Sequence, residues 1–292
     1  MLKLSCPLQS PKLGRQVERA LQIGGRTEWV VDISSEGGGT LHGYFDSHAE
    51  ASRAFAELQA HVPGLPDTPD VRPLSDEDWQ GSYKAHFQPT QAGRFLLVPA
   101  WTEKPLASAA DAIVLRLDPG LTFGTDHPTT RLCLAALEAF ATPRAKLAEL
   151  RFIDVGSGSG VLGIAALLLG FGAGSAFDTD ALAVARTREN AGRNGVSERL
   201  QCRECGIDRG LEATADLVFA NIHHNVLVAH AERLLGAVSP GGILVLSGCL
   251  EVDRELLQSA FEAAAIREHW PLASINWKAE DGWAAIEISR RP

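Results

Sequence analysis

Residues 152–160 read Phe-Ile-Asp-Val-Gly-Ser-Gly-Ser-Gly, and an apolar run, Val161 to Leu169, follows them. The aromatic and β-branched residues at the start predict a short strand, and the apolar run predicts a helix. Glycines at three alternate positions between them predict a tight turn, because glycine allows positive φ and lets a ligand lie directly against the backbone. The free N–H groups at the start of the helix can then bind that ligand. The stretch therefore predicts a site for a nucleotide-like cofactor.

Two classes of cofactor use this geometry, and the acid before the glycines distinguishes them. Gly158, Gly160 and Gly163 satisfy the dinucleotide pattern G-x-G-x-x-G, which leaves a nicotinamide oxidoreductase open. Asp154, however, places a carboxylate just before the turn, where it would repel a pyrophosphate. The same carboxylate suits a ligand with an ammonium and a sulfonium, such as S-adenosylmethionine. The pattern D-x-G-x-G-x-G also resembles the first motif of the class I methyltransferases.

Strands and helices alternate from residue 147 onward, in the order that builds a parallel, doubly wound sheet. Strands are expected at residues 151–155, 174–177, 200–203, 217–220, 243–247, 266–269 and 283–288. Helices are expected at residues 161–169, 181–194, 226–238 and 254–264. The predicted fold is α/β, with a seven-stranded Rossmann-like domain.

A proline-rich segment, residues 63–73, divides the chain, because prolines at this density continue neither a helix nor an inner strand. Before it, the pattern predicts a strand, a helix, a hairpin and a second helix, with a further strand near the prolines. This order indicates a small ferredoxin-like α+β domain, which has no evident catalytic residues and is expected to dock a substrate. The expected divisions are residues 1–65 for docking, 66–105 for a linker and inter-domain segment, and 106–292 for the cofactor-binding domain.

Two acids follow the second predicted strand of the larger domain. Asp178 comes 22 residues after Gly156, and an acid about 20 residues after such a turn accepts hydrogen bonds from ribose hydroxyls. Asp180 stands just before a helix and is interpreted as its N-cap. The residues expected to bind the cofactor thus include Asp154, Gly156, Gly158, Gly160 and Asp178.

The fourth predicted strand ends at Asn221, and ligands of open α/β sheets bind at such strand ends. The Asn221 amide can donate and accept hydrogen bonds, so it could hold a substrate amine beside a methyl donor. His223 and His224 follow as alternative bases, although loop histidines are more often exposed to solvent. Further upstream, Thr129 or Thr130 is expected to cap or open the next helix.

Several further motifs make the chain similar to the PrmA family of bacterial ribosomal protein methyltransferases, which modify large-subunit protein eleven. The motifs are Asp118-Pro-Gly-Leu-Thr-Phe-Gly-Thr125, His127-Pro-Thr-Thr130, Asn190-Ala-x-x-Asn194-Gly-Val, Ala220-Asn-Ile222 and Pro240-Gly-Gly-Ile-Leu-Val-Leu-Ser-Gly248. Glu77-Asp-Trp79 with Phe87-x-Pro89 also resembles the family's inter-domain region. The resemblance covers roughly residues 75 to 250, and the N-terminal module matches in kind.

The resemblance implies a class I fold and transfer of methyl groups from S-adenosylmethionine to lysine side chains and the α-amino terminus of the ribosomal protein. Carried over by position, the family's cofactor contacts fall on Thr130, Gly156, Asp178 and Asn221. Two positions depart from the family pattern. Asp126 stands where a glycine is usual, in a loop one residue shorter, and Ser157 replaces the usual cysteine.

The composition limits partners and location. The 292 residues carry a net charge of −9, which disfavours nucleic-acid recognition because phosphate contacts need clustered Lys and Arg. The five cysteines, an odd number without regular spacing, indicate a reducing cytoplasm, and no metal site is expected. No apolar run approaches the roughly 20 residues of a membrane span. We expect a cytoplasmic monomer.

Three alternatives stay open. A class I methyltransferase acting on another protein or on a small amine would share the same motifs. A nicotinamide oxidoreductase is disfavoured by Asp154. A non-catalytic ribosome-binding module would keep the docking domain but would tolerate loss of the cofactor acids, and Asp154 and Asp178 are both present.

Overall fold

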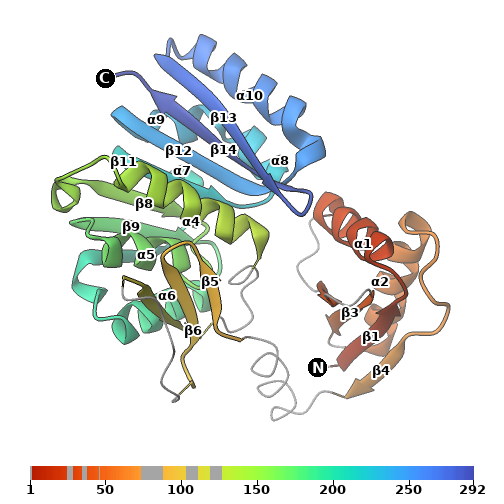
Figure 1. Ribbon diagram of the computed structural model, residues 1–292. Helices are drawn as coiled ribbons and strands as arrows, with labels where there is room; N and C mark the ends of the chain where they lie inside the picture. Colours follow the sequence, from red (N-terminus) through yellow and green to blue (C-terminus); the bar gives the residue numbers. More distant parts are fainter. Residues whose placement is uncertain are drawn as a thin grey trace. The chain divides into compact units, whose positions relative to one another are not determined.

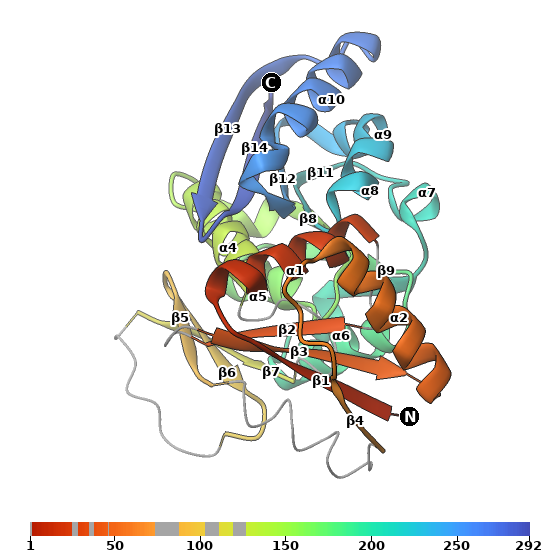
Figure 2. The same cartoon turned by 90° about the vertical axis from the view of Figure 1, so that its right-hand side faces the viewer.

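The computed structural model describes residues 2–24, 29–34, 38–45, 47–73, 88–102, 111–118 and 127–292. The chain forms two compact units, Met1–Tyr83 and Lys84–Pro292 (Figures 1 and 2). The motifs around Glu77 and Phe87, and residues 119–126 with Asp126, lie outside the described residues.

The first unit is one sheet covered by two helices. Its elements are β1 (Leu2–Leu8), α1 (Pro11–Gly24), β2 (Trp29–Ser34), β3 (Gly38–Phe45), α2 (His48–His61) and β4 (Asp70–Pro73). The strands lie in the order β2-β3-β1-β4, and every neighbouring pair is antiparallel. Apolar side chains of both helices and of the sheet form one core, and Figure 2 shows the helices lying along one face. The expected order of elements, including the strand near the prolines, is confirmed.

The second unit is built on a seven-stranded mixed sheet in the order β10-β9-β8-β11-β12-β14-β13 (Figure 1). Five neighbouring strands are parallel, and β14 runs antiparallel between β12 and β13. The strands are β8 (Arg151–Val155), β9 (Ala173–Asp178), β10 (Leu200–Glu204), β11 (Ala215–Asn221), β12 (Val238–Leu250), β13 (Leu272–Glu280) and β14 (Trp283–Arg290). The helices are α4 (Pro128–Ala141), α5 (Val161–Leu169), α6 (Ala181–Arg193), α7 (Ile207–Gly210), α8 (His224–Ala229), α9 (Ala231–Gly236) and α10 (Arg254–Arg267), with short 3₁₀ turns η1 (Leu147–Glu149), η2 (Ser197–Arg199) and η3 (Glu251–Asp253).

Alternate residues of the central strands serve the two faces of this sheet. Phe152 of β8 and Phe219 of β11 pack with α4 and α5 on one face. Ile153 and Val218 pack with α8, α9 and α10 on the other. A strand whose neighbouring side chains point to opposite faces can be apolar throughout only when both faces are covered. This double cover explains the continuous apolar runs seen in the sequence.

A small sheet packs against the α4–α5 side. It consists of β5 (Thr90–Ala92), β6 (Phe95–Pro99) and β7 (Ile113–Leu117), in that order. β5 and β6 are antiparallel, whereas β6 and β7 are parallel. Phe95, Leu97, Leu115 and Leu117 are fully buried in the same core as α4 and α5.

Two expected elements differ from the structure. The strand expected at residues 266–269 is wrong, because α10 continues to Arg267 and ends where His269 adopts a positive φ of 49°. The helix expected at 226–238 is interrupted at His230, which separates α8 from α9, and Val238 already belongs to β12. β4 follows the expected boundary at residue 65 and pairs with β1, and the first compact unit ends at Tyr83. The expected functional divisions of the chain stay a prediction.

Candidate functional site

The glycine turn between β8 and α5 has the predicted backbone conformation. Gly156, Gly158 and Gly160 have φ values of 68°, 55° and 79°, which side chains other than glycine rarely adopt. The amides of Gly156 and Ser157 donate to the carbonyl of Phe177, at 2.9 and 3.1 Å, which fixes the turn to the end of β9. The turn thus presents bare backbone at the carboxyl edge of the parallel strands.

Asp154 lies beneath this turn. Its side chain is 2% exposed, and its Oδ2 accepts a hydrogen bond of 3.0 Å from the Gly163 amide in the first turn of α5. Burial raises the pKa of the carboxyl to about 7, although the bond from Gly163 favours the charged form and lowers it. The carboxyl therefore orders the start of α5, and its influence on the choice of cofactor stays a prediction.

Asp178 joins the end of β9 to the glycine turn. Its Oδ2 accepts from the Gly158 amide and its Oδ1 from the Asp180 amide, both at 3.0 Å. Each carboxylate oxygen has further lone pairs, so Asp178 can still accept bonds from ribose hydroxyls. Asp180 is the N-cap of α6 and accepts from the Leu182 amide at 2.8 Å, which confirms its predicted role.

Asn221 and Thr130 come together across the strand ends. The Asn221 Nδ2 donates to the Thr130 Oγ1 at 3.4 Å, and Thr130 is 1% exposed. The structure therefore unites two of the predicted residues, one from β11 and one from the first turn of α4. Thr129 and Thr130 lie in the first turn of α4, in keeping with the expectation that one of them opens the helix, but neither caps it, because His127 is the N-cap.

Sequence reasoning missed the role of His127. Its Nδ1 lies 3.0 Å from the Thr129 Oγ1, and its ring packs edge-on against Trp283 at 4.5 Å between centroids. Burial, assisted by Arg131, lowers the pKa of His127 to about 4, so the ring is neutral near pH 7. The His-Pro pair before a helix was the available signal, since proline favours the first helical position.

Ile222 is held between two distant glycines, a second feature that the sequence did not indicate. A Cβ at Gly156 would come within 2.3 Å of the Ile222 Cγ2, and one at Gly248 within 2.4 Å of the Ile222 carbonyl oxygen. Gly248 also has a φ of 80°. These close contacts restrict the position of Ile222. Because Ile222 follows Asn221 directly in the chain, they also help to hold Asn221 at the end of β11.

The two histidines after Ile222 stack on each other, with centroids 4.6 Å apart. His223 caps α8, and His224 is 7% exposed with its Nδ1 3.7 Å from the Asp253 Oδ2. Burial and the neighbouring His224 lower the pKa of His223. This differs from the solvent-facing arrangement that is usual for loop histidines, and a role as base stays a prediction.

The site fits a nucleotide-like cofactor. The turn provides bare backbone, Asp178 provides acceptors, and Thr130 and Asn221 provide polar groups nearby. Across the described ranges, no three His, Cys, Asp or Glu side chains are grouped to hold a metal ion. No described helix is long and apolar enough to cross a membrane.

Comparison with known proteins first places the fold among methyltransferases. The crystal structure of a ribosomal protein L11 methylase from Lactobacillus delbrueckii subsp. bulgaricus superimposes with a TM-score of 0.59 at 26% identity, covering 68% of this chain and 96% of that one. The ribosomal protein L11 methyltransferase of Pelotomaculum thermopropionicum is 38% identical over 89% of this chain and 82% of its own length. The ribosomal protein L11 methyltransferase of Pseudomonas putida strain W619 is also 38% identical, over 85% of this chain and 80% of its own length.

The family follows from the same comparisons. The model of the ribosomal protein L11 methyltransferase (PrmA) family matches residues 22–291. The chain belongs to this family, and the resemblance inferred from its motifs is confirmed.

Proposed function

We propose that this protein transfers methyl groups from S-adenosylmethionine to lysine side chains and the N-terminal α-amino group of ribosomal protein L11. Family membership supports the reaction and the substrate. The observation that carries the assignment to this site is the bond from the Gly158 amide to Asp178, which joins the glycine turn to the acid at the end of β9.

The residues present fit this cofactor. When bound, it supplies a methyl group on a positively charged sulfur. Asp178 is proposed to accept the ribose hydroxyls with its remaining lone pairs. Gly156, Gly158 and Gly160 let the cofactor lie against the backbone, and Asp154 orders the helix start behind them.

The protein's contribution to the transfer is positioning. Asn221 is proposed to hold the incoming amine in line with the methyl carbon, with Thr130 fixing the Asn221 amide. Removing a proton from a lysine of pKa about 10.4 near pH 7.4 costs about 4 kcal/mol. Desolvation of the amine and a neighbouring positive charge both favour its neutral form and reduce this cost. The reaction therefore does not require a strong general base.

The strand order of the larger unit supports a seven-stranded, Rossmann-like class I methyltransferase fold. The order β2-β3-β1-β4 with two helices on one face supports a ferredoxin-like fold for the smaller unit. That unit is proposed to dock the ribosomal protein. The protein is proposed to act as a cytoplasmic monomer that recognises no nucleic acid directly, in keeping with its net charge of −9.

The decisive experiment is transfer of labelled methyl groups. The protein is incubated with S-adenosylmethionine and a ribosomal extract, and the labelled product is identified by mass. Label in L11, at lysines and the N-terminus, is the expected result. Label in another protein or a small amine would instead indicate a related methyltransferase. NAD binding without transfer would indicate an oxidoreductase, and ribosome binding without transfer a non-catalytic module.

Docking is tested by removing residues 1–83, the first unit as the structure bounds it. The remaining chain should bind S-adenosylhomocysteine about as well as the whole protein but should no longer methylate L11. Circular dichroism controls for folding of the fragment. Methylation of L11 at the full rate by this fragment would contradict a docking role.

A further inference from the structure

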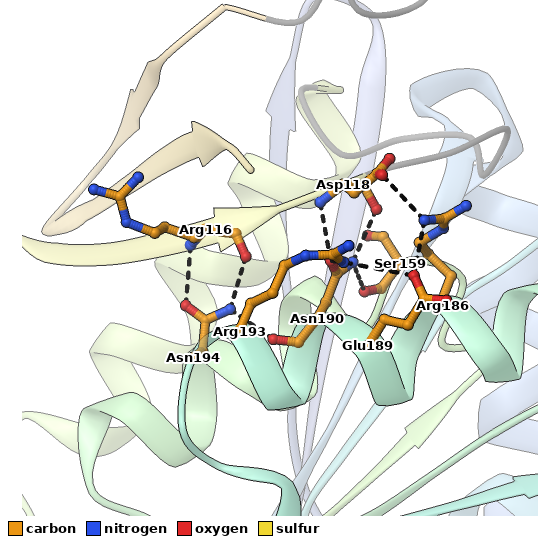
Figure 3. A network of polar contacts seen from close by, with 8 residues as sticks. All are labelled: Arg116, Asp118, Ser159, Arg186, Glu189, Asn190, Arg193 and Asn194. Atoms are coloured by element: carbon orange, nitrogen blue, oxygen red, sulfur yellow. Dashed lines mark hydrogen bonds and ion pairs between the residues drawn. The ribbon is translucent and has the colours of Figure 1, made fainter. Parts of the chain in front are cut away.

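The motif Asn190-Ala-x-x-Asn194 places one asparagine in the last turn of α6 and one at its C-cap. Their side-chain amides bind Asp118, just after β7, and Arg116, within β7. Asn190 Oδ1 accepts from the Asp118 amide and its Nδ2 donates to the Asp118 carbonyl, both at 2.9 Å. Asn194 does the same with Arg116, at 3.0 and 2.8 Å (Figure 3). Each asparagine side chain thus hydrogen-bonds both the backbone N–H and the backbone C=O of one residue, as a neighbouring strand would.

Asn190 and Asn194 are four residues apart, whereas their partners Asp118 and Arg116 are two residues apart. Helix and strand geometry explain why the two spacings agree. Four residues of helix rise about 6 Å, and two residues of strand advance about 6.6 Å. β7 pairs with β6 on one side only and forms the edge of its three-stranded sheet among the described residues. The asparagines therefore satisfy the outer edge of β7 and its continuation at Asp118, and so protect it from pairing with another chain.

Asn190 also contacts the glycine turn, which Asn194 does not. Its Nδ2 also donates to the Ser159 carbonyl of the glycine turn at 2.9 Å, and the residue is fully buried. One helical turn earlier, the Thr187 hydroxyl donates to the neighbouring Gly158 carbonyl at 3.0 Å. α6 thus binds two successive carbonyls of the turn.

These bonds fix how the turn presents its peptide groups. In a planar trans peptide the C=O and N–H point in opposite directions. Because Thr187 holds the Gly158 carbonyl toward α6, the Ser159 N–H of that peptide points away from α6. Asn190 fixes the next peptide, whose Gly160 N–H donates to the Ser157 carbonyl at 2.7 Å.

We propose that Asn190 is a positioning residue for the cofactor, because its single buried amide sets the glycine turn and locks the end of β7 to it. Thr187 supports the same turn, whereas the side-chain amide of Asn194 binds Arg116 of β7 and the Asn190 carbonyl. This inference rests on the proposed binding of S-adenosylmethionine at the glycine turn. It goes beyond that function by assigning to α6 a role in cofactor affinity.

The test compares Asn190→Ala with Asn194→Ala in the full chain, since both remove an asparagine that binds β7 from the same helix. S-adenosylhomocysteine affinity is measured by calorimetry, and the unfolding midpoint is measured without ligand. Asn190→Ala should raise Kd by about tenfold, because the Ser159 carbonyl loses its donor and the turn loses its fixed orientation. Asn194→Ala should lower the midpoint while changing Kd by less than about twofold.

Thr187→Val provides a second, nearly isosteric probe that removes only the hydroxyl. It should raise the Kd for S-adenosylhomocysteine by about threefold. If Asn190→Ala does not fold, this Kd alone tests whether α6 positions the glycine turn. Equal changes in Kd for the two asparagine variants, or an unchanged Kd for Asn190→Ala or Thr187→Val, would overturn the assignment. Failure of the unmodified protein to bind S-adenosylhomocysteine would instead overturn the proposed function.

Discussion

Replacing Gly156 by alanine tests whether close packing of the glycine turn against Ile222, in the loop after β11, affects stability and turnover. The added Cβ would lie 2.3 Å from the Ile222 Cγ2, whereas carbon atoms in contact are about 3.5–4.0 Å apart. Ile222 must therefore move by about 1 Å or more, and it follows Asn221 directly in the chain. Gly156→Ala should consequently reduce both stability and turnover.

The cost divides into two parts. Alanine at a φ of 68° occupies the left-handed region, at a cost of about 1–2 kcal/mol. Forcing an extra methyl group into a packed contact costs a further 1–3 kcal/mol or so. We therefore expect Gly156→Ala to lower the free energy of unfolding by about 2–5 kcal/mol.

A double-mutant cycle with Ile222→Ala separates the two parts, because that substitution removes the Cγ2 atom. In the Ile222→Ala background, Gly156→Ala should cost only the backbone part, so the cycle should show a coupling of about 1–3 kcal/mol. Urea denaturation of the full chain measures the four free energies, and turnover per folded molecule is measured on the same samples. An additive cycle would refute the proposed contact between the turn and Ile222.

The remaining predictions concern single side chains of the site. Asp178→Ala should weaken binding of S-adenosylhomocysteine by about 1.5–3 kcal/mol. Asp180→Ala should instead lower the free energy of unfolding by about 1 kcal/mol and leave Kd unchanged. An equal effect of both variants on Kd would show that Asp178 is not the specific ribose contact. Asn221→Ala should lower turnover by at least about tenfold, or roughly 1.4 kcal/mol, and normal turnover per folded molecule would remove Asn221 from the site. Burial raises the pKa of Asp154 to about 7, so the folded protein holds this proton more tightly and loses stability as the pH rises from about 4 to 7. Asp154→Asn does not ionise, so it should gain stability relative to the unmodified protein between pH 5 and pH 8 in urea denaturation, and a difference independent of pH would contradict this.

The features that the sequence predicts correctly depend on local chemistry. The turn at 156–160 requires glycine because of its φ values, and Asp180 caps a helix that begins at the next residue. The first five expected strands, which form the parallel part of the sheet, also follow from short apolar runs. Each of these features is decided within a few residues of chain, where pattern and backbone preference agree.

The features that it misses depend on contacts between distant segments. Nothing near Asp154 shows that its carboxyl is buried and accepts a hydrogen bond from the Gly163 amide of α5. Likewise, the contacts of Ile222 with Gly156 and Gly248 arise only when three strands align. The strand expected at 266–269 is wrong because Ile266 and Arg267 still belong to α10, and β13 begins only after Pro271.

The position of β14 determines when the larger unit can finish folding. β14 lies between β12 and β13, yet its residues are made after those of every other strand in the sheet. The smaller unit is complete by residue 83 and can fold while synthesis continues at about 5–20 residues per second. The sheet that carries the glycine turn must wait for residues 283–290 to leave the ribosome, since β13 otherwise has no partner strand. Ribosome-bound chains arrested before β14 should therefore resist protease in the first unit and be cleaved in the second, and equal resistance of both would show that β14 is dispensable for this step.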